Sequence, residues 1–232
     1  MQNLTSEDFA NSGLLPADSS AAATTLRLIS GENLADFTNS LSATDQQWLT
    51  RQSFTAKAGQ VAWLENGDGV LGKADADSLA TLGHLPYTLP EGVYRLAEAT
   101  TFIALLGWGL GSYSFNRYKA AERGPAQLIL PESADAAELV NTVAATYLTR
   151  DLINTPAQDM APSHLQAEVE ALATTFEASV STVVGDELLD LECGAIHAVG
   201  RAADDAPRLM DLTWGDANDP KITIVGKGVT FD

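Results

Sequence analysis

The twelve residues 221–232, KITIVGKGVTFD, decide the fold class that this chain is expected to have. Ile222, Ile224 and Val225 are β-branched and apolar, which suits a buried strand of an α/β sheet. Gly226 and Gly228 then end the predicted strand and flank Lys227. Open α/β sheets bind ligands at the carboxyl ends of their strands, so this lysine is a candidate site residue.

Asp232 follows Lys227 by five residues, and two kinds of site could use such a pair. A phosphate-binding loop would need Gly at 221 and Ser or Thr at 228, where this chain has Lys and Gly. A metal site would use the Asp232 carboxylate and the neutral amine of Lys227, since the lysine pKa moves readily on burial or near a dication. The remaining alternative is a lysine and an aspartate at the end of a strand with no ligand at all.

The stretch VGKGVTFD, residues 225–232, resembles the signature of the leucyl aminopeptidase (cytosol aminopeptidase) family. In that family the lysine binds one metal of a dinuclear site, and the aspartate contributes to both metals. The resemblance therefore implies that Lys227 and Asp232 are metal ligands. It assigns no catalytic residue within this chain, because the other ligands and the assisting lysine and arginine follow the signature in the family.

Two further segments resemble the same family in the same order. Residues 151–162, DLINTPAQDMAP, resemble its Asn-Thr-Pro-x-x-x-Met segment, which leads into the catalytic domain. The earlier segment resembles the end of its first domain, and its matching residues are Leu110, Gly111, Tyr113, Phe115 and Tyr118. Without the family, the later segment reads as a turn punctuated by prolines.

The resemblance implies a metal-dependent aminopeptidase that releases N-terminal amino acids from peptide substrates. Its cofactors would be two divalent metal ions, Mn or Zn, and its copies would assemble as a homo-oligomer, a hexamer in the family. The implied fold is a macro-like N-terminal α/β domain, then the beginning of an α/β/α peptidase domain with a mainly parallel sheet. The alternative is a non-catalytic fragment, or a structural or assembly chain of such a peptidase, because only the first two ligands fall within residues 1–232.

Composition excludes several other classes of function. The 232 residues include 13 Lys and Arg against 31 Asp and Glu, a net charge of −18, which disfavours nucleic acid and anionic membranes as partners. Cys193 is the only cysteine, so no disulfide can form within the chain. The sequence has neither a membrane-length apolar run nor a secretion signal. It therefore predicts a cytoplasmic protein.

The order of patterns along the chain predicts four parts. Residues 1–24 are expected to be a flexible arm, and residues 25–131 the N-terminal domain. Residues 132–155 have apolar positions at helical spacing and predict a connector helix that begins after Ser133. Residues 156–232 would begin the catalytic domain. Alternation of strands with helices favours a mainly parallel sheet covered on both faces.

Two local patterns predict elements of the N-terminal domain in more detail. Residues 61–64 and 69–71 flank Asn66-Gly67, which is typical of a tight β-hairpin turn. Thr44 with Gln47 has the spacing of a capping box and predicts the start of a helix.

Overall fold

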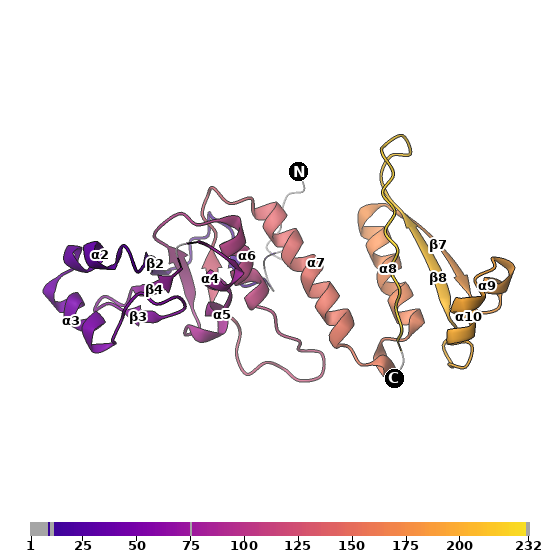
Figure 1. Cartoon of the computed structure of the whole chain (residues 1–232), viewed down its shortest axis with the longest axis horizontal. Coiled ribbons are helices and arrows are strands. Elements are labelled where there is room, and N and C mark those ends of the chain that lie inside the picture. Colours follow the sequence, from indigo (N-terminus) through magenta and orange to yellow (C-terminus); the bar gives the residue numbers. More distant parts are fainter. Residues whose placement is uncertain (1–8, 10–11, 75, 231–232) are drawn as a thin grey trace. The chain divides into compact units, whose positions relative to one another are not determined.

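The computed structural model describes residues 9, 12–74 and 76–230, and the chain divides into two compact units, Met1–Thr149 and Arg150–Asp232 (Figure 1). Within the described residues, no helix combines the length and the apolar character that a bilayer span requires. Asp232 and residues 1–8, which belong to the predicted site and the predicted arm, lie outside the described residues.

The first unit is built on a sheet with the strand order β1-β6-β5-β2-β4-β3. Its strands are β1 (Leu14–Leu15), β2 (Thr24–Ser30), β3 (Val61–Trp63), β4 (Gly69–Lys73), β5 (Val93–Leu96) and β6 (Gln127–Ile129). The pairs β1–β6, β5–β6, β2–β5 and β2–β4 are parallel, and β3 pairs antiparallel with β4. The predicted α/β class with a mainly parallel sheet is confirmed.

Part of the predicted arm belongs to this sheet. Leu14 pairs with Leu128 of β6, and its side chain is fully buried in the apolar core. Ser12 supports the strand from within the arm, because its hydroxyl donates to the Phe9 carbonyl and accepts from the Leu14 amide. The described end of the segment is therefore an edge strand.

The β3–β4 hairpin is confirmed with the turn that the sequence predicts. Gly67 has a φ of +87°, a conformation that glycine adopts at little cost. The Asn66 side-chain oxygen accepts from the Asp68 amide at 3.0 Å, and the Leu64 amide donates to the Asp68 carbonyl at 2.9 Å. Local hydrogen bonds therefore fix the register of the pair.

Helices connect the strands of the first unit, and their bounds are α2 (Leu34–Ser40), α3 (Ala43–Arg51), α4 (Leu79–Gly83), α5 (Leu85–Thr88) and α6 (Phe102–Gly111). The helix start predicted around Thr44 is confirmed, since α3 begins at Ala43, but Thr44 is not the capping residue. Ser42 is the N-cap, and its hydroxyl accepts from the Asp45 amide at 3.1 Å. Ser42 and Asp45 have the same three-residue spacing two positions earlier, and Ser42, the first residue able to cap, begins the helix.

Helix α6 is continuous although it contains three glycines. A Cβ atom at Gly107 or Gly111 would overlap the carbonyl oxygens of Leu79 and Gly83 in α4. At Gly109 it would press on Val143. The glycines lower the helix propensity of α6, but they allow the backbones of α4 and α6 to come into direct contact.

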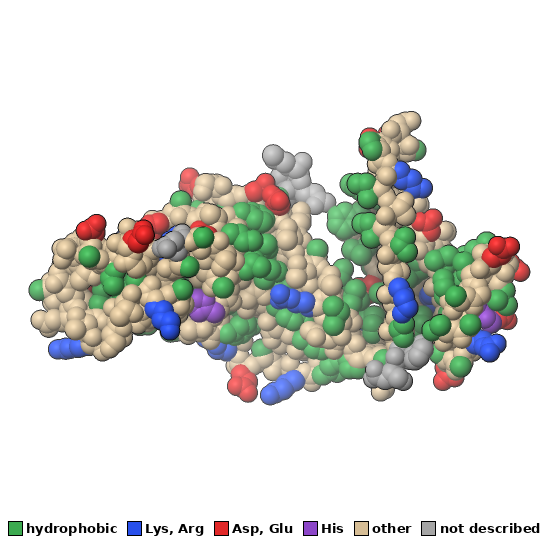
Figure 2. All heavy atoms as spheres, viewed as in Figure 1, with side chains coloured by type: hydrophobic (Ala, Val, Ile, Leu, Met, Phe, Trp, Pro, Cys, Tyr) green, Lys and Arg blue, Asp and Glu red, His purple; other side chains and the backbone are tan. Residues whose placement is uncertain are grey.

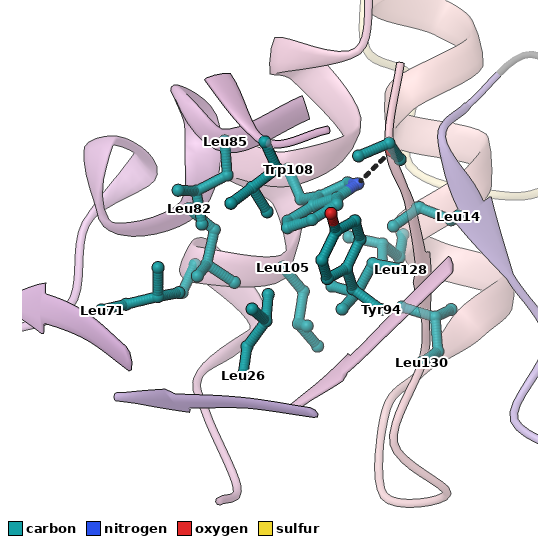
Figure 3. Close-up of a cluster of buried hydrophobic side chains, with 14 of the residues drawn as sticks. Leu14, Leu26, Leu71, Leu82, Leu85, Tyr94, Leu105, Trp108, Leu128 and Leu130 are labelled. Carbon is teal, nitrogen blue, oxygen red and sulfur yellow. Dashed lines mark hydrogen bonds between the residues drawn. The ribbon is translucent and has the colours of Figure 1, made fainter. Parts of the chain in front are cut away.

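The core of this unit surrounds Trp108, whose indole is fully buried (Figure 3). Its Nε1 donates to the Gly13 carbonyl at 2.9 Å and to the Ala126 carbonyl at 3.2 Å. Tyr94 lies beside it, with ring centroids 6.3 Å apart. A single side chain thus joins α6 to the segments that lead into β1 and β6.

The predicted connector helix is α7 (Ala136–Asn154), and the division between the two units falls within it. It begins two residues later than expected, because Asp135 rather than Ser133 caps it, accepting from the Glu138 amide at 3.0 Å. Leu139 and Val143 of its apolar face are buried.

The second unit contains η1 (Ala157–Asp159), α8 (Pro162–Phe176), β7 (Ser179–Val184), α9 (Glu187–Asp190), α10 (Gly194–Gly200) and β8 (Arg208–Thr213). Strands β7 and β8 are antiparallel, with Ser179 opposite Thr213 and Val184 opposite Arg208. The described strands of this unit therefore do not show the parallel pairing predicted for it. Mainly parallel sheets often carry an antiparallel strand, so this pair alone does not change the fold class.

Candidate functional site

The segment that carries the predicted metal ligands begins where β8 ends. Trp214 anchors this point, since its Nε1 donates to the Phe176 carbonyl at the end of α8 at 3.0 Å. Gly215 follows with a φ of +95°, and the Asp216 carboxylate then accepts from the Asn218 amide at 2.8 Å. These hydrogen bonds from Asn218 hold the pKa of Asp216 below its usual value. The turn directs the chain into residues 221–230.

The predicted strand at residues 222–225 is not formed. Residues 221–230 have no regular secondary structure, and the side chains of Ile222 and Ile224 are 86% and 91% exposed. Figure 2 shows hydrophobic side chains at the surface along this stretch, which is yellow in Figure 1. β-branched residues favour a pleated and half-buried surface, and no described strand pairs with this segment to provide one.

Lys227 is exposed on this segment. The adjacent Gly228 faces α8, where a Cβ atom would lie 3.9 Å from Leu165 Cδ2. Its predicted partner, Asp232, lies outside the described residues, so the structure does not test whether the two side chains meet. Among the described residues, no group of three or more His, Cys, Asp or Glu side chains could hold a metal ion.

The start of α8, the helix beside Gly228, is fixed by a carboxylate 42 residues away. Asp205 Oδ2 accepts from the Ser163 amide at 2.9 Å and from the Ser163 hydroxyl at 2.5 Å. The cap position itself is Ala161, which has no side-chain acceptor. Asp205 therefore does the work of an N-cap residue from another part of the chain.

Arg208 completes this arrangement at the first residue of β8. Its Nη2 donates to Asp205 Oδ1 at 2.5 Å, and its Nη1 donates to Gln166 Oε1 at 2.5 Å. Burial raises the pKa of Asp205, but the hydrogen bonds from Ser163 and the charge of Arg208 outweigh it and leave this pKa lowered. We refer to Ser163, Gln166, Asp205 and Arg208 as the α8 clamp. The sequence analysis missed the clamp, because no local spacing connects residue 163 with residue 205.

One of the segments that resemble the family precedes α7, and the other begins in the last turn of α7. Tyr113 and Tyr147 pack edge to face with centroids 5.0 Å apart, and the Tyr147 hydroxyl donates to the Gly109 carbonyl at 2.5 Å. In the second segment, Thr155 is buried, and its hydroxyl donates to the Asp151 carbonyl at 2.7 Å. Met160 is buried as well. These contacts join α7 to α6 and close the carboxyl end of α7.

The described residues alone do not fit a dinuclear metal centre. The amine of Lys227 is one suitable donor, but two divalent ions need several carboxylate, imidazole or amine ligands that converge on them. Lys227 is instead exposed on an irregular segment. The structure instead provides helix α8, whose start the α8 clamp fixes, and the irregular segment 221–230, in which Gly228 lies near Leu165 of α8.

Two family models match the chain. The model of the M17 aminopeptidase N-terminal domain matches residues 24–131. The model of the catalytic domain of the cytosol aminopeptidase family matches residues 147–232, the part that contains Lys227 and Asp232. Together the two models cover most of the chain.

Curated relatives agree with the models. A probable cytosol aminopeptidase of Corynebacterium efficiens is 40% identical over 153 residues, which are 59% of this chain and 29% of the relative. A probable cytosol aminopeptidase of Halorhodospira halophila is 35% identical over 198 residues, which are 78% of this chain and 37% of the relative. The chain thus spans about a third of the length of these relatives.

Solved structures show the same fold. The cytosol aminopeptidase of Coxiella burnetii matches with a TM-score of 0.82 and 34% identity, over 90% of this chain and 47% of that one. The bottromycin maturation enzyme BotP, solved in complex with Mn, matches with a TM-score of 0.63 and 23% identity, over 85% of this chain and 46% of that one. By the order and extent of these matches, the chain belongs to the M17 cytosol aminopeptidase family, through its N-terminal domain and the beginning of its catalytic domain.

Proposed function

We propose that the chain is part of a metal-dependent aminopeptidase that releases N-terminal amino acids from peptides. One observation carries this proposal: the VGKGVTFD stretch lies within the region that matches the family's catalytic domain. The relatives are named cytosol aminopeptidases, and a structure of the same fold was solved with Mn. We therefore assign two divalent ions, Mn or Zn, as cofactors and the cytoplasm as the compartment.

Lys227 and Asp232 are the metal ligands in this proposal. A lysine can bind a metal only through the lone pair of its neutral amine, so metal binding must displace a proton from Lys227. The exposure of Lys227 and the absence of regular structure around it are compatible with a ligand that becomes ordered when the other ligands are present. Since the described residues do not form the site, no catalytic step is assigned to them.

Substitution of Lys227 tests this function in the polypeptide encoded by the whole reading frame that contains residues 1–232. With a leucine anilide substrate and added Mn²⁺ or Zn²⁺, we expect turnover that a chelator removes. Lys227→Arg keeps a positive charge but cannot supply a lone pair, so we expect turnover to fall about 100-fold or more. Lys221→Arg, six residues earlier on the same exposed segment, is the matched control. Turnover that resists both the chelator and Lys227→Arg would refute the proposal.

Residues 1–232 as a separate polypeptide form the second candidate, a structural or assembly component without catalysis. The described residues favour it for this polypeptide alone, because Lys227 has no carboxylate or imidazole cluster around it among them. We expect no appreciable turnover and weak metal binding in a calorimetric titration. Turnover by the 232-residue polypeptide that survives repurification and disappears in Asp232→Ala would contradict this expectation.

We also propose that copies of the chain associate into a homo-oligomer and that the substrates are peptides. The support is family membership, and the structure adds exposed apolar side chains in the second unit, such as Trp214 at 71% and Ile224 at 91% exposure. Exposed apolar surface of this kind favours association. Sedimentation velocity over a range of concentrations measures it directly.

A further inference from the structure

Basic residues are scarce in this chain, and three of the 13 fall within seven positions. Arg117, Lys119 and Arg123 lie between α6 and β6, in a segment that we call the basic loop (residues 115–123). In a protein with a net charge of −18, such a loop is a local reversal of the surface charge. It therefore offers an acidic partner a place to approach.

Arg123 fixes the base of the basic loop. Its Nη1 donates to the Leu89 carbonyl at 2.8 Å, and its Nη2 donates to the Pro86 carbonyl at 3.4 Å. Its guanidinium carbon also lies 5.6 Å from the centroid of the Tyr87 ring, a cation–π distance. Arg123 is thus committed to the fold of the first unit, and it is not available to a partner.

The tip of the loop presents an aromatic and cationic surface. The rings of Phe115 and Tyr118 pack edge to face with centroids 5.9 Å apart. The Arg117 guanidinium lies 5.8 Å from the Tyr118 centroid, and Tyr118 is 55% exposed. These contacts hold Arg117 and Tyr118 together at the surface, and Tyr and Arg are enriched at protein interfaces.

Lys119 adds a second exposed cation. Its Nζ lies 3.8 Å from Glu122 Oε1, with the two side chains 84% and 90% exposed. Such fully solvated pairs contribute little, so a partner carboxylate can replace Glu122 at low cost.

A complementary surface lies in the second unit, on α9 and the two residues after it. Glu187, Asp190 and Glu192 are exposed acids, and Leu189 and Leu191 between them are 50% and 54% exposed. We call these five residues the acidic leucine patch. It combines carboxylates with large apolar side chains, as the basic loop combines cations with aromatic rings.

We propose that the basic loop of one copy of this chain docks on the acidic leucine patch of a second copy. Salt screens the repulsion between the two net negative charges beyond about 8 Å at physiological ionic strength, so the local match of charges decides the approach. The two surfaces differ, so the contact is head to tail. An open assembly keeps one free basic loop at one end and one free acidic leucine patch at the other until a ring closes. The inference does not depend on aminopeptidase activity.

A charge exchange tests this contact in the 232-residue chain. Arg117→Glu with Lys119→Glu makes the loop acidic, and Glu187→Lys with Asp190→Lys makes the patch basic. We expect either double variant alone to self-associate about tenfold or more weakly than the wild type in sedimentation velocity. An equimolar mixture should recover association, because each loop then meets a patch of opposite charge on the other variant. A contact within one chain would not produce this recovery.

Arg51→Glu with Lys57→Glu is the matched control for the loop variant, since it makes the same change in net charge at two exposed residues elsewhere in the first unit. We expect its association to equal that of the wild type, and raised salt to weaken wild-type association. Circular dichroism confirms that each variant folds. A wild type that stays monomeric to roughly 100 μM, reversal variants that associate like the control, or a mixture that does not recover would each overturn the proposal.

Discussion

Asp205 accepts hydrogen bonds from both the backbone amide and the hydroxyl of Ser163, 42 residues earlier, and thereby caps the start of α8. The carboxylate links the loop before β8 to the first turn of α8, so the two elements cannot separate without exposing an uncapped helix end. Arg208 holds the same carboxylate from the strand side. The α8 clamp is therefore a polar connection between α8 and β8, in addition to the hydrogen bond from Trp214 to the Phe176 carbonyl.

Removal of the clamp carboxylate should destabilise the second unit. We expect Asp205→Ala to lower the free energy of unfolding by about 1–3 kcal/mol, because it removes a helix cap and leaves the partly buried Arg208 guanidinium without its carboxylate partner. Ser163→Ala keeps the amide donor and should cost less. Urea unfolding followed by circular dichroism measures both variants, and equal losses would show that the hydroxyl alone carries the effect.

The pH dependence of stability should reflect the same carboxylate. The pKa of Asp205 is lowered in the folded chain, so the unfolded chain binds more protons near its ordinary value of about 3.9. The resulting stabilisation is present above about pH 4 and is lost as the pH falls through the folded pKa. Comparing the wild type with Asp205→Asn across this window isolates the contribution. If the free energy of unfolding of the two proteins changed with pH in the same way, a contribution from the Asp205 carboxyl would be excluded.

Gly111 in α6 tests the close crossing of α4 and α6. A Cβ atom there would overlap the Gly83 carbonyl oxygen, which belongs to backbone that cannot rotate away. We expect Gly111→Ala to destabilise the first unit by about 1–3 kcal/mol, although alanine favours helices. Gly124→Ala is the control, because nothing lies within 4 Å of its Cβ position. The midpoint of thermal unfolding should be lower than that of the wild type for Gly111→Ala and unchanged for Gly124→Ala.

The sequence predicted those features that depend on neighbours along the chain. The Asn66-Gly67 turn determines the β3–β4 hairpin by itself, since Gly67 takes the positive φ and Asn66 bonds to the Asp68 amide. Helix α7 was predicted from its apolar spacing, and only its cap differed, with Asp135 in place of Ser133. Several neighbouring residues could each cap a helix, so the end of a helix is harder to predict than the helix itself.

Features that depend on distant partners were not predicted. Residues 222–225 have the composition of a strand, but a strand also needs a neighbour, and composition does not specify one. The α8 clamp joins residue 163 to residues 205 and 208 with no local pattern. The role of Lys227 came from the resemblance, because spacing alone does not distinguish a metal ligand from a lysine at the end of a strand.

We expect Lys227 to be needed for turnover but not for the stability of the fold. Its side chain is exposed on an irregular segment, so Lys227→Ala should change the free energy of unfolding of the 232-residue chain by less than about 0.5 kcal/mol. The same substitution should remove metal-dependent turnover from the polypeptide encoded by the whole reading frame, since the metal would lose a ligand. Urea unfolding and the anilide assay, run on the same substitution, measure the two effects. A variant that unfolds more easily by 1 kcal/mol or more, on the order of a lost buried hydrogen bond, would show instead that Lys227 supports the fold. Unchanged stability together with unchanged turnover would remove it from the metal site.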